Sequence, residues 1–269
     1  MKQIKLPNGN RIYVLDKLTA IDIYKEIFEE NIYLRSGIQV KPGDTILDIG
    51  GNIGLFSMFI SQKVPDLKIY AFEPIPQIFE ALKANLTGNT SIAKIENIGL
   101  SNEESTAEFN FYPRVCADST STPFLFDSQV EMFVHSSNKG IRRIVPKKIK
   151  RWMIAKGLKY MYTPIKITCP LKTVSQIISE NKIENINLIK LDAENAERQV
   201  LEGIVDSDWE KIQQLSIEVH TNIPDGNTLV PFIMNLLKSK GFTLDLDTNS
   251  RFSNVGVHML YATRKIAKN

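Results

Sequence analysis

Residues 44–54 read DTILDIGGNIG. An apolar run at 45–49 stops directly at Gly50 and Gly51, and Gly54 follows after two further residues. A stiff strand fixes a position in the molecule, and glycines after it let the backbone approach a ligand and let the next helix begin tightly. A plain tight turn has the same composition. The stretch therefore predicts a strand, a turn and a helix, with the turn as a candidate ligand site.

Apolar strands alternate with helical segments along the rest of the chain, which predicts an α/β protein with a doubly wound, mostly parallel sheet. The last two strands have no helix between them, so they are expected to form an antiparallel hairpin at one edge. The expected strands are 45–49, 68–74, 92–100, 106–112, 166–171, 187–193, 214–220, 242–246 and 256–263. The expected helices are 19–30 with Thr19 as its N-cap, 54–63, 76–86, 173–182, 194–204 and 228–241, and residues 3–15 are expected to form a hairpin.

The alternation of strands and helices also predicts the domain organisation. One domain is expected to span residues 1–269, because the alternation runs through most of the chain. Residues 1–40 are expected to form an N-terminal cap. Residues 113–165 lack the alternation of strands and helices and are expected to be an insertion or lid.

The composition is that of an ordinary globular protein, with 43% apolar residues in a chain of 269. No apolar run reaches the length of about 18 residues that a membrane span needs. The N-terminus has no apolar signal region, and the two cysteines have no metal-site spacing, so a reduced, cytoplasmic protein is expected. The net charge of +3 hides an uneven distribution, because residues 132–179 contain 11 Lys or Arg and no Asp or Glu.

A second signal for a ligand is Glu73, which lies 19 residues after Gly54 at the end of the next expected strand. An acidic residue in this position accepts hydrogen bonds from ribose hydroxyls in many doubly wound folds. A solvated strand-end glutamate is the alternative. Asp48 beside the glycine turn would repel a pyrophosphate but would suit a cation, which favours S-adenosylmethionine over NAD.

Five segments, in this order, resemble the FkbM family of S-adenosylmethionine-dependent methyltransferases: LDIGGNIGLFS, IYAFEP, ENIGLS, IKLDAENAERQVLEGI and SIEVH. The resemblance covers roughly residues 40–263 and implies the class I, Rossmann-like methyltransferase fold. The N-terminal segment also resembles family members found in or beside polyketide and nonribosomal peptide assembly lines. Such members typically methylate hydroxyl oxygens of metabolites or carrier-bound intermediates, so an O-methyltransferase of natural product biosynthesis is expected.

The resemblance also implies cofactor-binding positions. The methionine part would lie against Asp48, Gly50, Asn52 and Gly54, the ribose would be held by Glu73 before Pro74, and the adenine would lie along Asn97, Ile98 and Gly99. Tyr33 precedes the glycine strand and is expected either to cover the cofactor or to be a core tyrosine. Asn195 stands where the family usually has glycine, in Asp192-Ala193-Glu194-Asn195-Ala196-Glu197, which puts the shape of the substrate pocket in doubt.

Candidate catalytic residues lie at two further strand ends, which open onto the same crevice in a doubly wound sheet. His220 is the first choice of general base because its reference pKa is near neutral, with a purely structural histidine as the alternative. Asp192, Glu194 and Glu218 are expected nearby, to orient the imidazole or the substrate. Asp192 and Glu218 with His220 could instead hold Mg²⁺, although magnesium prefers ligand sets made only of oxygen, and no metal is favoured. Glu197 and Glu202 are expected on solvated helix faces.

The segment 139–159 contains nine basic residues and partly helical apolar spacing. It could dock an acidic carrier protein, form a solvated lid or contact nucleic acid. An acidic carrier protein or acidic metabolite is favoured as the partner of this basic segment. The rest of the chain is acidic, which disfavours nucleic acid as a partner. Two alternatives to O-methylation remain: C- or N-methylation on the same fold, and a protein that binds S-adenosylmethionine without turnover.

Overall fold

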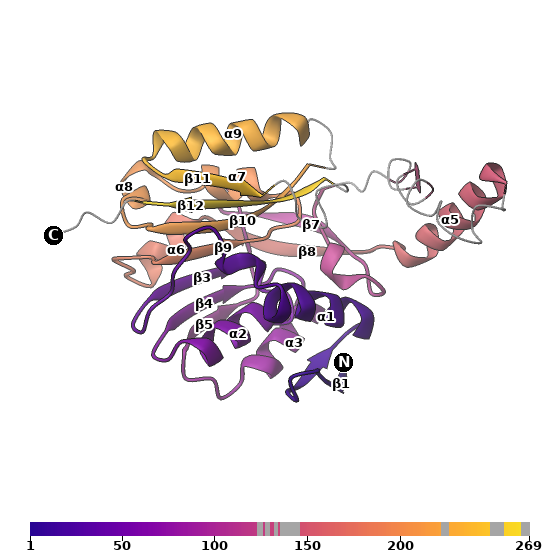
Figure 1. The fold of residues 1–269 in the computed structure, drawn as a ribbon, viewed down its shortest axis with the longest axis horizontal. Coiled ribbons are helices and arrows are strands. Elements are labelled where there is room, and N and C mark those ends of the chain that lie inside the picture. The colour runs from indigo at the N-terminus through magenta and orange to yellow at the C-terminus, as the bar shows by residue number, and fades with distance from the viewer. Residues whose placement is uncertain are drawn as a thin grey trace.

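The fold is built around a central sheet with helices on both faces (Figure 1). The computed structural model describes residues 1–122, 126, 130–131, 134, 146–221, 226–247 and 256–264. Within these residues the central sheet has seven strands in the order β11-β12-β10-β9-β3-β4-β5. In that order they span Thr243–Asp247, Val257–Thr263, Gln214–His220, Leu188–Leu191, Thr45–Ile49, Lys68–Phe72 and Ile92–Glu96.

The strand directions confirm the predicted mostly parallel sheet with an antiparallel edge. β3 pairs in parallel with both β4 and β9, and β9 pairs in parallel with β10. β12 runs antiparallel to both β10 and β11, so the last two strands form the expected edge hairpin. The strand order reverses between β3 and β9, and this is the place where doubly wound sheets bind ligands.

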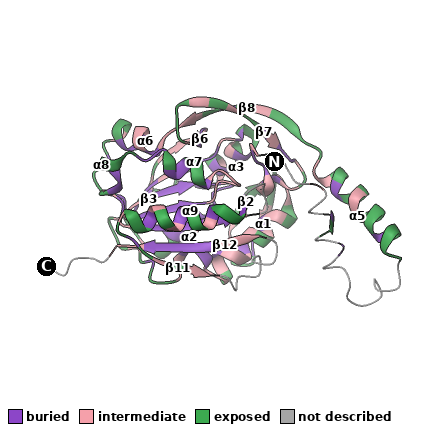
Figure 2. Ribbon diagram, turned by 90° about the horizontal axis from the view of Figure 1, so that it is seen from above, coloured by how far each residue is buried: buried purple, intermediate pink, exposed green. Residues whose placement is uncertain are grey.

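Successive side chains of a strand point to opposite faces of the sheet, and each face packs in its own hydrophobic core. Ile46 of β3 packs in one core, whereas Leu47 and Ile49 pack in the other. Figure 1 shows the two helical layers, and Figure 2 shows the buried strands between them. Helices of the first layer are α1 (Lys17–Tyr24), α2 (Leu55–Lys63) and α3 (Pro76–Leu86). Helices of the second layer are α6 (Val174–Glu180), α7 (Glu197–Glu202), α8 (Asp206–Trp209) and α9 (Gly226–Ser239).

The N-terminal segment packs on the first layer. Its hairpin consists of β1 (Lys2–Lys5) and β2 (Arg11–Val14), as expected. The prediction of Thr19 as a helix N-cap is wrong, because the side chain of Asp16 accepts a hydrogen bond from the Thr19 backbone and α1 begins at Lys17. The same helical run continues as the π-helix η1 (Lys25–Glu29), and the 3-10 turn η2 (Ile32–Leu34) then leads towards β3.

A second, three-stranded sheet lies beside the central one and was not anticipated as a separate unit. It has the order β6-β8-β7, which span Gly99–Leu100, Ile165–Lys172 and Ser105–Phe111. The single strand expected at 92–100 is therefore divided between the two sheets. The segment between β7 and β8 contains η3 (Cys116–Asp118) and the 15-residue helix α5 (Lys147–Met161). Both ribbon views show α5 extending away from the rest of the molecule (Figures 1 and 2).

The helices in the described part of the chain are all too short or too polar to cross a bilayer.

The glycine turn after β3 is built against the end of β9. Gly50 has a φ of +70°, and a Cβ there would lie 1.8 Å from the carbonyl oxygen of Asp192. Gly54 has a φ of +85° and directly precedes α2. Only glycine satisfies both the close backbone approach and the left-handed conformation at position 50.

We expect Gly50→Ala to destabilise the fold by at least about 3 kcal/mol, because the new methyl group must displace the backbone of Asp192. The matched control is Gly43→Ala, since Gly43 has a φ of +88° but no atom within 4 Å of its Cβ position. In the control the free energy of unfolding should fall only by the cost of the left-handed conformation, about 1–2 kcal/mol. Urea unfolding measures both, and equal losses would contradict the proposed contact.

Candidate functional site

A cavity of about 650 Å³ opens at the carboxyl ends of β3 and β9, at the point of strand reversal. Its wall is formed by the glycine turn, the residues after β4 and β9, and the end of β10. The structure brings most of the predicted site residues together there. Those on the wall are Tyr33, Gly50, Asn52, Glu73, Pro74, Ile98, Gly99, Asp192, Glu194, Glu218 and His220.

Three predicted cofactor residues lie behind the wall instead. Asp48 is fully buried and accepts a hydrogen bond from the Ser57 hydroxyl at 2.6 Å. Gly54 packs towards Leu86, and the Asn97 amide donates to the carbonyls of Glu73 and Pro74. These residues hold the wall in place, and direct ligand contacts from them stay predictions.

Lys190 lies in the middle of the buried strand β9, and its role was not predicted. Its ammonium donates to the carbonyl oxygen of Gly50 at 2.6 Å and lies 3.5 Å from Asp48 and 3.4 Å from Asp192. Burial lowers the pKa of Lys190, but the two carboxylates outweigh burial and the pKa is raised. Lys190 is therefore a fixed positive charge that joins the glycine turn to the end of β9.

Glu73 has the position expected of a ribose-binding acid. One carboxylate oxygen accepts from the Asn52 backbone at 3.1 Å and the other from the Ile75 backbone at 2.9 Å. Burial raises the pKa of Glu73 to about 7, although both backbone hydrogen bonds oppose this. Each oxygen keeps a further lone pair, so the carboxylate can accept two more hydrogen bonds from the cavity.

Tyr33 brings the N-terminal segment into the site. Its hydroxyl lies 3.0 Å from an oxygen of Asp192 and 3.0 Å from an oxygen of Glu218. Burial raises the pKa of Tyr33 well above 10, so the hydroxyl keeps its single proton and can donate to only one of them. Burial and the Asp192 charge raise the pKa of Glu218 to about 7, so near neutral pH Glu218 can supply the proton for the second contact. Next to Tyr33, the backbone carbonyl of Ile32 accepts from the buried hydroxyl of Tyr261 at 2.6 Å.

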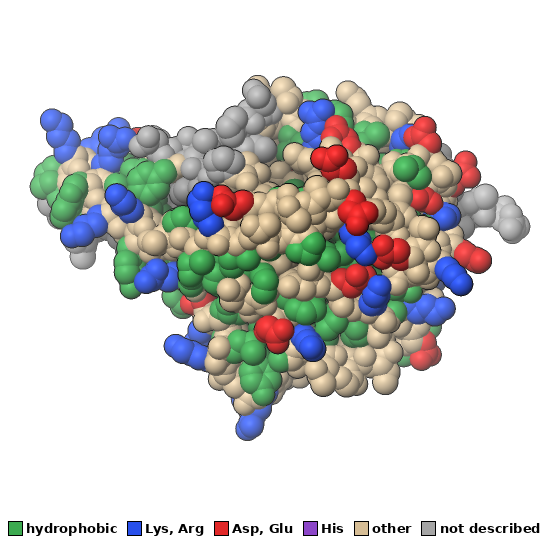
Figure 3. Space-filling view, turned by 180° about the vertical axis from the view of Figure 1, so that it is seen from behind, with side chains coloured by type: hydrophobic (Ala, Val, Ile, Leu, Met, Phe, Trp, Pro, Cys, Tyr) green, Lys and Arg blue, Asp and Glu red, His purple; other side chains and the backbone are tan. Residues whose placement is uncertain are grey.

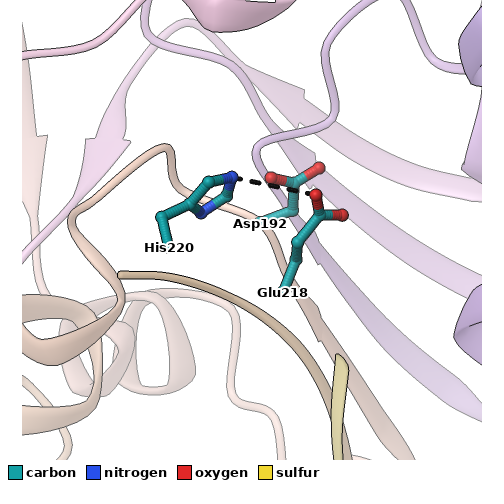
Figure 4. A group of neighbouring side chains, drawn as sticks. All are labelled: Asp192, Glu218 and His220. Atoms are coloured by element: carbon teal, nitrogen blue, oxygen red, sulfur yellow. Dashed lines mark ion pairs between the residues drawn. The ribbon is translucent and has the colours of Figure 1, made fainter. Parts of the chain in front are cut away.

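His220 at the end of β10 is held by Glu197, which corrects the expectation that Glu197 lies on a solvated face. Glu197 is fully buried, and its carboxylate lies 2.9 Å from Nδ1 of His220. The other ring nitrogen, Nε2, is 3.5 Å from Glu194. It is also 3.7 Å from Glu218, as Figure 4 shows. Burial lowers the pKa of His220, but Glu194 and Glu197 outweigh it and the pKa lies well above its ordinary value. His220 therefore carries a proton at neutral pH unless another positive charge enters the cavity.

The turn after β9 is strained in a way that explains part of its sequence. Glu194 and Asn195 both have positive φ, of 46° and 78°. Asn tolerates this left-handed conformation better than most residues, and glycine best of all. Asn195 therefore keeps the turn that a glycine would form, while it adds a side chain to the cavity wall.

The far rim of the cavity comes from the segment between β7 and β8. Asp118 and Tyr162 both line the cavity, and the Tyr162 hydroxyl donates to the Asp118 carboxylate. The Thr120 hydroxyl donates to the Glu194 carbonyl. Neither contact was predicted from the sequence. Their separation of 44 and 74 residues leaves no local signal.

The candidate metal ligands do come together. Within the described residues, Asp192, Glu218 and His220 offer ligand atoms that all lie within 4.8 Å of one another (Figure 4). Tyr33 and Lys190 already contact the same carboxylates. The cluster can thus hold a cation, and a metal there stays an alternative to a cationic organic ligand.

Comparison with known proteins gives a consistent result. The sequence model of the family described as the methyltransferase FkbM domain matches residues 48–244. The 31-O-demethyl-FK506 methyltransferase FkbM of Streptomyces tacrolimicus is 29% identical over 269 residues, covering 98% of this chain and 97% of that protein. The AMB antimetabolite synthetase AmbE of Pseudomonas aeruginosa is 31% identical over 275 residues, covering 97% of this chain but only 12% of AmbE.

The crystal structure of the methyltransferase FkbM from Methylobacillus flagellatus is similar with a TM-score of 0.52 and 13% identity. The match covers 91% of this chain and 52% of that one. At this identity it supports the fold alone, which is that of the class I methyltransferases.

The pKa of Glu73 predicts how stability depends on pH. Between about pH 4.5 and 7 the folded chain holds this proton and the unfolded chain does not, so the free energy of unfolding falls as the pH rises through that window. The full effect is roughly 3 kcal/mol. Glu73→Gln should remove this part of the slope, as measured by urea unfolding at several pH values.

The exposed Glu103→Gln serves as control and should leave the slope unchanged. If Glu73→Gln and wild type show parallel curves, the buried carboxyl titrates normally and its assigned environment is wrong.

Proposed function

The chain belongs to the FkbM methyltransferase family, and from this premise we propose that it transfers the methyl group of S-adenosylmethionine to a hydroxyl oxygen of a biosynthetic intermediate. The acceptor is a small molecule, either free or attached to a carrier protein. The observation that carries the proposal is the acid-rich cavity at the strand reversal, whose wall includes the glycine turn and, hydrogen-bonded to it, Glu73.

The residues present fit this cofactor. Asp118, Asp192, Glu194 and Glu218 line the cavity, and the buried cations near them are Lys190 and His220. Burial raises the pKa of Glu194 and of Glu218, so a positively charged ligand would relieve a real electrostatic cost. One oxygen of Asp192 is also buried without a hydrogen-bond partner. An ammonium group satisfies both conditions, a sulfonium supplies the positive charge alone, and a pyrophosphate satisfies neither.

S-adenosylmethionine, when bound, supplies a methyl group already activated on a positively charged sulfur. The protein's part is to align the acceptor oxygen with that methyl carbon and to receive the hydroxyl proton. Glu73 would accept the ribose hydroxyls through its remaining lone pairs, and the backbone of Gly50 and Gly51 would line the cofactor's side of the cavity. Tyr33 fixes the carboxylates of Asp192 and Glu218 at the floor of the cavity.

His220 is the proposed acceptor of the hydroxyl proton, at Nε2. Glu197 accepts from the opposite nitrogen and so orients the ring towards the cavity. The raised pKa of His220 means that the neutral, proton-accepting form becomes populated only as the pH rises. A cationic ligand in the cavity lowers that pKa, because it offsets the surrounding carboxylates.

The proposed acceptor class rests on two relatives. The name of the Streptomyces tacrolimicus protein describes methylation at an oxygen, and the AmbE match lies within a much longer synthetase. C- or N-methylation, and cofactor binding without turnover, remain the competing functions.

The first test is calorimetric titration of S-adenosylmethionine, S-adenosylhomocysteine and NADH into wild type, Glu73→Ala and the control Glu103→Ala. The first two ligands should bind wild type and the control equally, and Glu73→Ala roughly tenfold or more weakly, because a charge-assisted contact is lost. NADH should not bind. A parallel series with Mg²⁺ tests the metal alternative. Folded protein that binds neither methyl-cycle ligand would refute the proposal.

The second test follows the His220 proton by NMR titration and by the pH dependence of methyl transfer to a hydroxylated acceptor. Wild type should show a His220 pKa above 6.5, and Glu197→Gln should lower it by about one unit or more. The value of kcat/KM should rise with pH through this pKa of the free protein, and kcat through the lower pKa of the complex. His220→Gln should lose roughly a hundredfold or more in kcat while it still binds the cofactor. Full activity of His220→Gln would favour C- or N-methylation.

A further inference from the structure

Helix α5 exposes several large apolar side chains. Nine large hydrophobic residues are exposed in the described part of the chain, and four of them lie on this one helix. They are Ile149, Trp152, Met153 and Tyr160, with exposed fractions of 51%, 62%, 58% and 62%. The other five are Met1, Tyr13, Leu18, Ile165 and Val205, all outside α5.

The four residues share one face of α5, because their spacing of three, four and seven residues is that of a helix. The opposite face packs inward, with Leu158 against Val130 and Val134. Within the stripe, the guanidinium of Arg114 lies over the Tyr160 ring at 4.1 Å, while Ile149, Trp152 and Met153 stay exposed. A stripe of this kind marks an interaction surface when nothing in the fold covers it.

The charge of α5 restricts what can cover the stripe. The helix contains six Lys or Arg and no Asp or Glu. Lys156 lies within the stripe itself, with its ammonium 5.3 Å from the centre of the Trp152 ring. Figure 3 shows blue and green side chains together on this protruding end of the molecule.

We propose that the α5 stripe, residues 149, 152, 153, 156 and 160, docks an acidic protein whose surface presents an apolar patch among carboxylates. A carboxylate facing Lys156 and apolar groups facing Trp152 and Met153 would satisfy every part of the stripe. This extends the proposed function by naming the partner that brings the methyl acceptor.

The observations favour a protein over other anionic partners. A helix that lies in a bilayer buries the centre of its apolar face, and here that centre holds Lys156. Nucleic acid would use the lysines but leave Ile149 and Met153 exposed to water. A second copy of this chain fits poorly, because pairing through the same stripe would bring together two helices that each carry six Lys or Arg and no Asp or Glu.

The position of α5 connects this surface to the cavity. Tyr162 directly follows α5 and lines the cavity, where its hydroxyl donates to Asp118. A partner docked on α5 is therefore held at the rim formed by the segment between β7 and β8. Trp152 lies roughly 15 Å along the helix from Tyr162, so a substrate carried by that partner would need an arm of at least about that length to reach the site.

Trp152 reports directly on the surface, because the other tryptophan, Trp209, is 2% exposed. The experiment titrates a phosphopantetheinylated acyl carrier protein without tryptophan into the full chain and follows Trp152 emission and its quenching by acrylamide. A blue shift and loss of quenching are expected, with weaker binding at higher salt. Lys156→Glu should weaken binding by at least about tenfold, and Met153→Ser should weaken it too.

The matched control is Lys238→Glu on α9, which makes the same charge change on an exposed position elsewhere and should bind like wild type. No response to the carrier protein would overturn the proposal. So would an equal response to phosphatidylserine vesicles or single-stranded RNA, or a shift that depends only on the chain's own concentration. Lys156→Glu should still bind S-adenosylmethionine, so failure of docking and failure of the proposed methyl transfer give different results.

Discussion

The buried ammonium of Lys190 is the interaction on which the site depends. It binds the carbonyl oxygen that ends β3 and lies between the carboxylates of Asp48 and Asp192, so it joins two strands where their order reverses. Without it, Asp48 and Asp192 would face each other across a buried gap with no positive charge between them. Removing one partner from such a buried set typically costs several kcal/mol. The glycine turn, the carboxylate of Asp192 and the ring of Tyr33 all contact this one charge.

The cavity holds more carboxyl groups than positive charges, and this excess determines which of its groups keep protons. Burial raises the pKa of both Glu73 and Glu218 to about 7, and Glu194 is shifted further in the same direction. These groups keep protons that they would lose in water. The cavity is thus prepared for a cation, and its protonation state changes when a cation enters. Raised carboxyl pKa values and a charged histidine in one cavity are typical of sites that perform proton transfer.

Much of the fold could be predicted from the sequence, because strand and helix periods are local properties. The strand at 45–49, the helix at 76–86 and the edge hairpin followed from pattern alone. The partners within the site could not be predicted in the same way. Glu197 pairs with a histidine 23 residues away, and only the packing of α7 against β10 decides that it is buried. Lys190 did leave a signal, since a lysine within the apolar strand NLIKL must find a buried partner. No such signal in the sequence indicated that β6, β7 and β8 form a separate sheet.

The contact of Tyr33 with the end of the sheet has a consequence for how the molecule is made. Tyr33 meets Asp192 and Glu218 across 159 and 185 residues, and its neighbour Ile32 is held by Tyr261 across 229. Contacts of such separation close late, because the chain entropy of the intervening loop must be lost first. A nascent chain that has extruded the glycine turn still lacks the strand that anchors the N-terminal segment. The site can therefore be completed only after β12 has left the ribosome.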